Sequence, residues 1–89
     1  MVHNNITITG RVQGVGFRYA AREAANSLQI KGFVRNLADG SVSIAAEGTD
    51  ENMAAFLAWC HEGPPRSRID HVAVMEGPWV GFAEFRISF

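Results

Sequence analysis

The chain has 89 residues, of which 47% are hydrophobic and 19% are charged, and its formal net charge is −1. This length predicts one compact domain over residues 1–89, and the near-zero charge argues against a nucleic-acid partner. The single cysteine excludes a disulfide framework and a zinc site made of several cysteines. No apolar run reaches the roughly 20 residues of a membrane span. The first residues lack a secretion pattern, so we expect a cytoplasmic protein without a membrane partner.

The first half of the chain predicts a strand, a helix and two further strands. Alternating apolar residues indicate a strand over 6–12. Apolar residues at spacings of four, three and four predict a helix over 17–29, with Gly32 just beyond its end. The next strand starts at Phe33, and an Asp-Gly turn leads from it into a third strand over 42–46.

The second half predicts another helix and two more strands. Thr49 is the expected N-cap, because its hydroxyl can accept a hydrogen bond from a first-turn N–H and two acidic residues follow it. An apolar face continues to Cys60, and the Gly-Pro-Pro segment at 63–65 ends the helix. Alternating apolar residues then indicate strands over 69–75 and 85–89.

The predicted order is therefore strand, helix, strand, strand, helix, strand, strand. Each helix has one apolar stripe, so we expect both helices on the same face of one sheet. The βαββαβ unit with an additional short C-terminal strand predicts an α+β fold, a ferredoxin-like α/β sandwich with an antiparallel-rich sheet. Many unrelated functions share this fold, so the function has to be argued from the site.

The loop before the first helix carries the strongest sign of a site. Residues 10–18 read Gly-Arg-Val-Gln-Gly-Val-Gly-Phe-Arg, between a strand end and a helix start. Glycines let successive N–H groups converge, and a helix start adds unpaired N–H groups, which together suit a phosphate-sized anion. Arg18 opposes the helix dipole, and a bound anion would explain its presence. A purely geometric glycine turn explains the same residues, so both interpretations stay open, although the spacing fits neither nucleotide fingerprint.

Two long segments resemble the signature sequences of the acylphosphatase family. The first is the loop over 10–18, and the second runs over 32–42 as Gly-Phe-Val-Arg-Asn-Leu-Ala-Asp-Gly-Ser-Val. The Gly-Pro helix ending and the closing strand are also similar, so the resemblance covers nearly the whole chain. It implies an enzyme that hydrolyses acyl phosphates, the mixed anhydrides of a carboxylate and phosphate, without a cofactor or metal. We expect a monomer whose partner is the small-molecule acyl phosphate, with inorganic phosphate as product and inhibitor.

The resemblance also implies roles for individual residues. Arg18 matches the arginine that binds the phosphate, and Asn36 matches the asparagine that orients the attacking water. The backbone N–H groups that match the phosphate cradle belong to Gln13, Gly14, Val15, Gly16 and Phe17. Arg35 precedes Asn36, and neighbours along a strand point to opposite faces, so we expect Arg35 on the surface.

Cys60 opens a competing interpretation, because Cys60 to Ser67 has the Cys-x5-Arg-Ser spacing of cysteine-dependent phosphatases. Such a loop needs the cysteine at a helix start, where a thiolate is stabilised. Here Cys60 lies on the apolar stripe near a helix end, and Pro64 and Pro65 remove two N–H donors. We therefore expect Cys60 in the core.

A binding module is the second alternative. The segment 31–33, Lys-Gly-Phe, opens like an RNA-recognition motif, but it lacks the further aromatic residues and falls on the second predicted strand. A regulatory acylphosphatase-like domain is a third alternative.

The dispersed histidines do not have metal-ligand spacing, and we expect surface or cap positions for His3, His61 and His71. Asp39 is predicted to be a turn residue.

Overall fold

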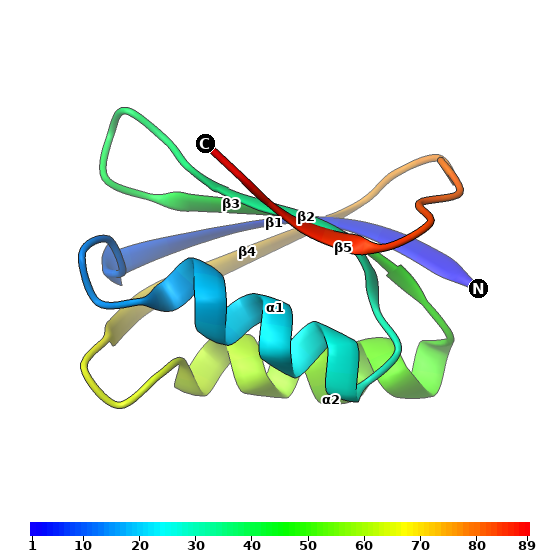
Figure 1. The fold of residues 1–89 in the computed structure, drawn as a ribbon, viewed down its shortest axis with the longest axis horizontal. Coiled ribbons are helices and arrows are strands. Elements are labelled where there is room, and N and C mark those ends of the chain that lie inside the picture. Colours follow the sequence, from blue (N-terminus) through cyan, green and yellow to red (C-terminus); the bar gives the residue numbers. More distant parts are fainter.

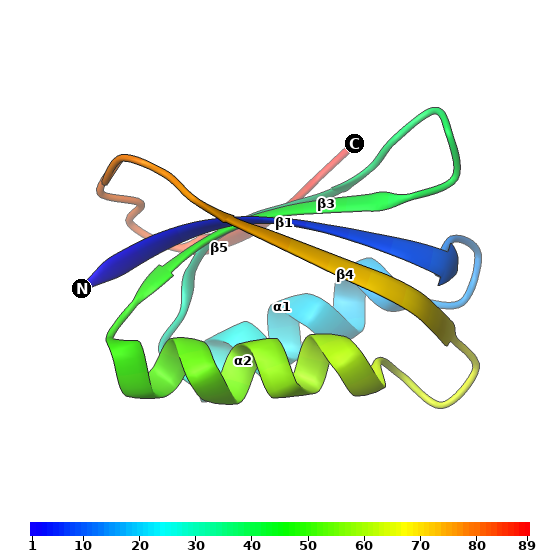
Figure 2. The same cartoon turned by 180° about the vertical axis from the view of Figure 1, so that it is seen from behind.

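A computed structural model describes all residues from 1 to 89 and contains five strands and two helices (Figure 1). In chain order these elements are β1 (Val2–Arg11), α1 (Phe17–Ser27), β2 (Lys31–Asn36), β3 (Val42–Gly48), α2 (Asp50–Glu62), β4 (Arg68–Glu76) and β5 (Phe85–Ser88). The sheet has the order β4-β1-β3-β2-β5, and every neighbouring pair is antiparallel except β2 with β5. Both helices cover one face of the sheet (Figures 1 and 2). The predicted ferredoxin-like α/β sandwich with an additional C-terminal strand is confirmed.

The core lies between the sheet and the two helices. Ile6 and Ile8 of β1 and Ile44 of β3 are fully buried on the helix-facing side of the sheet, where they meet Phe17 of α1 and Phe56 of α2. Burying one such side chain contributes about 1.5–3 kcal/mol to folding. The period-2 pattern of the strands and the single stripe of each helix therefore converge on one core. Neither helix has the length and apolar character needed to span a bilayer.

The second helix begins as the sequence predicts. Thr49 is its N-cap, and the hydroxyl oxygen of Thr49 accepts a hydrogen bond from the Asn52 N–H at 3.1 Å. Asp50 and Glu51 stand in the first turn, where negative charge is favourable. The helix ends at Glu62, before the Gly-Pro-Pro segment. This helix start therefore has a side-chain cap and favourable charges from within the chain.

Two expectations about the first helix and the second strand need correction. Helix α1 ends at Ser27, and the left-handed position after it is taken by Gln29, whose φ is 55°. Gly32, expected just beyond the helix as its end signal, lies inside β2. A Cβ atom at Gly32 would collide with the carbonyl oxygen of Ala45 on β3. Glycine is required there by close packing between strands and not by the helix end.

Strand β1 begins at Val2, four residues before the predicted start at 6. The early residues include polar ones whose side chains gave no apolar alternation, yet their backbone pairs with β3, with His3 opposite Glu47. His3 is only 6% exposed, so its predicted surface or cap position is wrong. His61 and His71 are exposed, as predicted.

Glu47 explains the burial of His3. Its carboxylate is 1% exposed and accepts N–H groups from Val80 at 2.6 Å, Gly81 at 2.9 Å and Phe82 at 3.0 Å. The Nδ1 of His3 donates to the same carboxylate at 2.7 Å. Burial alone would raise the pKa of Glu47, but these donors outweigh it and lower that pKa to about 2. Glu47 therefore holds the β4–β5 connection against the sheet face that the helices leave uncovered (Figure 1).

We expect Glu47→Gln to lower the free energy of unfolding by about 1–3 kcal/mol at pH 7, because an amide leaves buried donors without an acceptor. Since the folded pKa of Glu47 is about 2 against an ordinary 4.5, ionised Glu47 stabilises the fold above about pH 4.5. This stabilisation is lost as the pH falls from 4.5 towards 2. Urea unfolding of both proteins at pH 7, 5 and 3 measures the difference, which should shrink only at pH 3. A difference that is constant over this range would contradict the assignment.

Candidate active site

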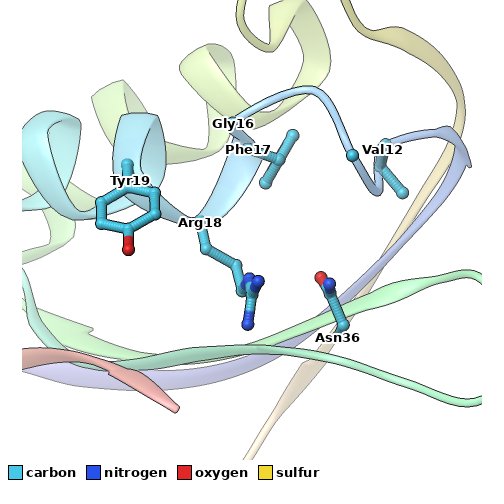
Figure 3. A pocket seen from close by; sticks show the side chains of 7 residues that line it. Val12, Gly16, Phe17, Arg18, Tyr19 and Asn36 are labelled. Atoms are coloured by element: carbon cyan, nitrogen blue, oxygen red, sulfur yellow. The ribbon is translucent and has the colours of Figure 1, made fainter. Parts of the chain in front are cut away.

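One cavity of about 130 Å³ lies where the loop between β1 and α1 meets the end of β2. Its walls are formed by Val12, Gly14, Gly16, Phe17, Arg18, Tyr19 and Asn36 (Figure 3). A water molecule occupies roughly 30 Å³ of liquid. The cavity therefore has room for a small tetrahedral anion with a water beside it.

The start of α1 supplies unpaired hydrogen-bond donors to this cavity. No side chain caps the helix, and its first turn holds no acidic residue. The first helical hydrogen bond runs from the Ala20 N–H to the Gly16 carbonyl, so the N–H groups before it lack helical partners. The N–H groups of residues 13–16 likewise donate to no other group of the chain. Helix α1 thus starts with unpaired N–H groups and no acidic side chain, whereas α2 starts with the Thr49 cap and two acidic residues.

Two glycines give the loop its shape. Gly14 has φ 73° and Gly16 has φ 77°, which is left-handed backbone that favours glycine. A Cβ atom at either position would meet nothing within 4 Å. The requirement for glycine at these two positions is therefore conformational.

Arg18 stands in the first turn of α1 and carries a guanidinium without an ionic partner. No carboxylate of the chain lies within ion-pair distance of it. Its Nη1 donates to the carbonyl of Ser88 at 3.4 Å, and the ring centroid of Phe89 is 4.7 Å from its guanidinium carbon. The end of β5 thus orients the guanidinium but does not neutralise its charge. That charge is available to an anion in the cavity.

Asn36 is the last residue of β2, and its side chain extends towards the same space as Arg18 (Figure 3). Its Oδ1 atom is buried and has no hydrogen-bond partner. A buried acceptor left unpaired costs about 1–3 kcal/mol, so such an atom calls for a donor that is brought in from outside. A water molecule held between Oδ1 and the bound anion would satisfy it.

Gln13 joins the two halves of the site through its side chain. Its Nε2 donates to the carbonyls of Leu37 at 2.8 Å and Ser41 at 2.9 Å, which flank the β2–β3 turn. Asp39 shapes that turn, as predicted. Its carboxylate accepts hydrogen bonds from the hydroxyl and the N–H of Ser41, and these lower the pKa of Asp39. The loop is therefore tied to the turn that follows Asn36.

The structure brings most of the predicted site residues together. Those that line the cavity are Gly14, Gly16, Phe17, Arg18 and Asn36. The side chains of Gln13 and Val15 do not line it, since one binds the β2–β3 turn and the other is buried in the core. The role of their backbone N–H groups stays a prediction.

Sequence reasoning missed two residues of the cavity wall, Val12 and Tyr19. Val12 was placed at the end of the preceding strand and within the 10–18 loop but was given no role in the site, and it lies just past the end of β1. Tyr19 follows Arg18 directly in the first turn of α1, and this adjacency was the available signal. The side chain of Gln13 was missed as well, because its partners are 24 and 28 residues away in the sequence.

The cysteine-phosphatase and RNA-binding interpretations lose their support. Cys60 is fully buried on α2, as predicted, and burial raises the pKa of its thiol to about 12. A thiol with that pKa does not act as a nucleophile near neutral pH. The ring of Phe33 makes an edge-on contact with Phe82 at 5.8 Å, which engages the aromatic group that an RNA platform would need. Arg35 is exposed, as predicted. No group of three or more potential metal ligands is found.

Comparisons with known proteins show the family of the chain. A family model described as acylphosphatase matches residues 4–87. The chain is 41% identical to an acylphosphatase of Actinobacillus succinogenes over 99% of both chains, and 43% identical to one of a Nocardioides species over 93% of this chain and 84% of the other. The crystal structure of the Bacillus subtilis acylphosphatase covers 100% of both chains with a TM-score of 0.96 at 36% identity. This extent of similarity in sequence and fold shows that the chain belongs to the acylphosphatase family of enzymes, which hydrolyse acyl phosphates.

Proposed function

We propose that this chain hydrolyses acyl phosphates to a carboxylate and inorganic phosphate through three parts of the cavity. The amide groups of residues 13–17 and the guanidinium of Arg18 hold the phosphoryl group, and Asn36 orients the attacking water. The observation that carries the proposal is the meeting of unpaired donors, an unpaired cation and a partnerless buried carbonyl around one space of about 130 Å³.

Binding and charge stabilisation come from the loop and Arg18. Backbone N–H groups and a guanidinium are fixed donors, so they need little rearrangement as negative charge grows on the equatorial phosphoryl oxygens. The guanidinium can give two parallel hydrogen bonds to such oxygens. Its contacts with the Ser88 carbonyl and the Phe89 ring restrain its position before substrate arrives. Phosphoryl transfer depends mainly on this kind of positioning and electrostatic support.

The water is placed by Asn36. Its Oδ1 can accept a hydrogen bond from the water and direct the water oxygen at phosphorus, in line with the bond that breaks. An amide is too weakly basic to take the proton, so Asn36 is a positioning group. The proton passes to a phosphoryl oxygen of the substrate. The new P–O bond forms as the bond between phosphorus and the acyl oxygen breaks, and that oxygen leaves with the electron pair.

The chemistry of the leaving group explains why the reaction needs so few catalytic side chains. A carboxylate is a weak base with a conjugate-acid pKa of roughly 4, so it leaves without being protonated. No residue that lines the cavity carries a carboxyl or imidazole group that could act as a general acid. In an ordinary alkyl phosphate monoester, the leaving group would be a strongly basic alkoxide. The cavity is therefore suited to acyl phosphates and unsuited to alkyl phosphates.

The reaction class can be tested with two substrates assayed side by side. We expect fast hydrolysis of benzoyl phosphate and negligible hydrolysis of 4-nitrophenyl phosphate, because only benzoyl phosphate releases a weakly basic carboxylate. Inorganic phosphate should inhibit competitively, and a chelator should leave the rate unchanged. Comparable kcat/KM values for the two substrates would contradict the proposal.

The residue roles can be tested with three variants and a neighbouring control. Arg18→Gln should abolish nearly all turnover, and Arg18→Lys should also fail, since an ammonium lacks the planar pair of donors. Asn36→Ala should lower kcat by about 10²–10³-fold, as expected for one lost preorganised polar group. Arg35→Gln, an exposed change next to Asn36, serves as the control and should keep kcat/KM. Circular dichroism checks that each variant folds. A normal kcat/KM in an Arg18 or Asn36 variant would refute the role of that residue.

A further inference from the structure

Tyr19 lines the cavity, yet neither phosphate binding nor water activation uses it. Its side chain is 54% exposed, and its hydroxyl makes no hydrogen bond within the chain. The guanidinium of Arg22, one turn along α1, lies 5.5 Å from the centre of its ring. This contact on an exposed helix face restrains the ring beside the cavity mouth. The ring is thus placed and solvent-accessible, and it has no role in the core.

The in-line geometry of the reaction relates the position of Tyr19 to that of the leaving group. The attacking water and the leaving group stand on opposite sides of the phosphorus atom. Asn36 fixes the side of the water, and Figure 3 shows Tyr19 on the other side of Arg18 from Asn36. The acyl group is therefore expected to extend past Arg18 towards Tyr19.

A second aromatic ring contacts the Arg18 guanidinium. Phe89 is 91% exposed, and its ring covers the Arg18 guanidinium at 4.7 Å. The end of β5, which leads to Phe89, approaches Arg18 from the side of Tyr19 and away from Asn36 (Figure 3). Two accessible rings thus flank the path of the leaving acyl group. Both present faces on which a flat or apolar group can stack.

We propose that Tyr19 and Phe89 form a subsite for the acyl group and give the enzyme a preference for aromatic acyl phosphates over acetyl phosphate. This inference rests on the proposed function, because it needs the phosphoryl group between the loop, Arg18 and Asn36. The phosphoryl group is the same in every acyl phosphate. Discrimination between substrates must therefore arise from contacts with the acyl part.

The test compares kcat/KM for benzoyl phosphate and acetyl phosphate. The two leaving carboxylates have similar basicity, so the ratio of their kcat/KM values reports mainly on acyl contacts. We expect the unmodified enzyme to favour benzoyl phosphate by at least about tenfold, the discrimination that one apolar contact region provides. Tyr19→Ala should lower the value for benzoyl phosphate about five- to tenfold and that for acetyl phosphate less than twofold. Tyr19→Phe keeps the ring and should keep the ratio.

Two further variants complete the design. Trp79→Ala removes a ring of similar exposure, 52%, from the β4–β5 connection and should leave the ratio unchanged. Phe89→Ala should lower kcat/KM for both substrates, because its ring also restrains Arg18, but it should lower the value for benzoyl phosphate more and so reduce the ratio. An equal loss on both substrates with weaker phosphate inhibition would show that Phe89 only positions Arg18, and this would overturn its place in the subsite.

The outcomes also separate this inference from the proposed function. If the unmodified enzyme hydrolyses neither substrate, the proposed function fails. If it hydrolyses both and Tyr19→Ala changes both kcat/KM values by the same factor, or changes neither, the acyl subsite is refuted while the proposed function stands.

Discussion

Unpaired backbone donors at the start of α1 are the feature on which the proposed function depends. The protein has two helix starts, and they are built in opposite ways. At α2 the Thr49 hydroxyl and two acidic side chains satisfy the helix end from within the chain. At α1 there is no cap and no acidic residue, and the first charged side chain is the cation Arg18. Such an arrangement disfavours the isolated helix, and a bound anion offsets that cost.

The rest of the fold positions the side chains and carbonyls that contact the loop before α1 and Arg18. Strand β2 ends at Asn36, and the Gln13 side chain holds the loop against the turn that follows. Strand β5 brings the Ser88 carbonyl and the Phe89 ring to Arg18. The buried Glu47 carboxylate anchors the connection that leads into β5. Groups from three parts of the sheet thus restrain the loop and the guanidinium.

Local patterns were sufficient to predict the elements and the loop. The periods of the apolar residues indicated both helices and four of the five strands, the Thr49 cap was confirmed, and the fold followed from the order of the elements. Contacts between residues that are far apart in the sequence could not be predicted from local patterns. His3 and Glu47 are 44 residues apart and meet only through the β1–β3 register, so no local pattern indicated that His3 is buried in a hydrogen bond with Glu47. The partners of the Gln13 side chain and the ring that faces Arg18 likewise depend on how the strands assemble. The orphan Oδ1 of Asn36 is visible only when its surroundings are known.

Binding of inorganic phosphate to the free enzyme, followed by amide nuclear magnetic resonance at constant ionic strength, tests the anion site most directly. Phosphate should produce saturable shifts that are largest for the N–H groups of residues 13–18 and for the Asn36 side chain. The N–H groups at the start of α2 serve as an internal reference and should not respond, because that helix end is already capped. Shifts that do not saturate, or that are centred on α2 or another surface, would contradict a phosphate cradle at the start of α1.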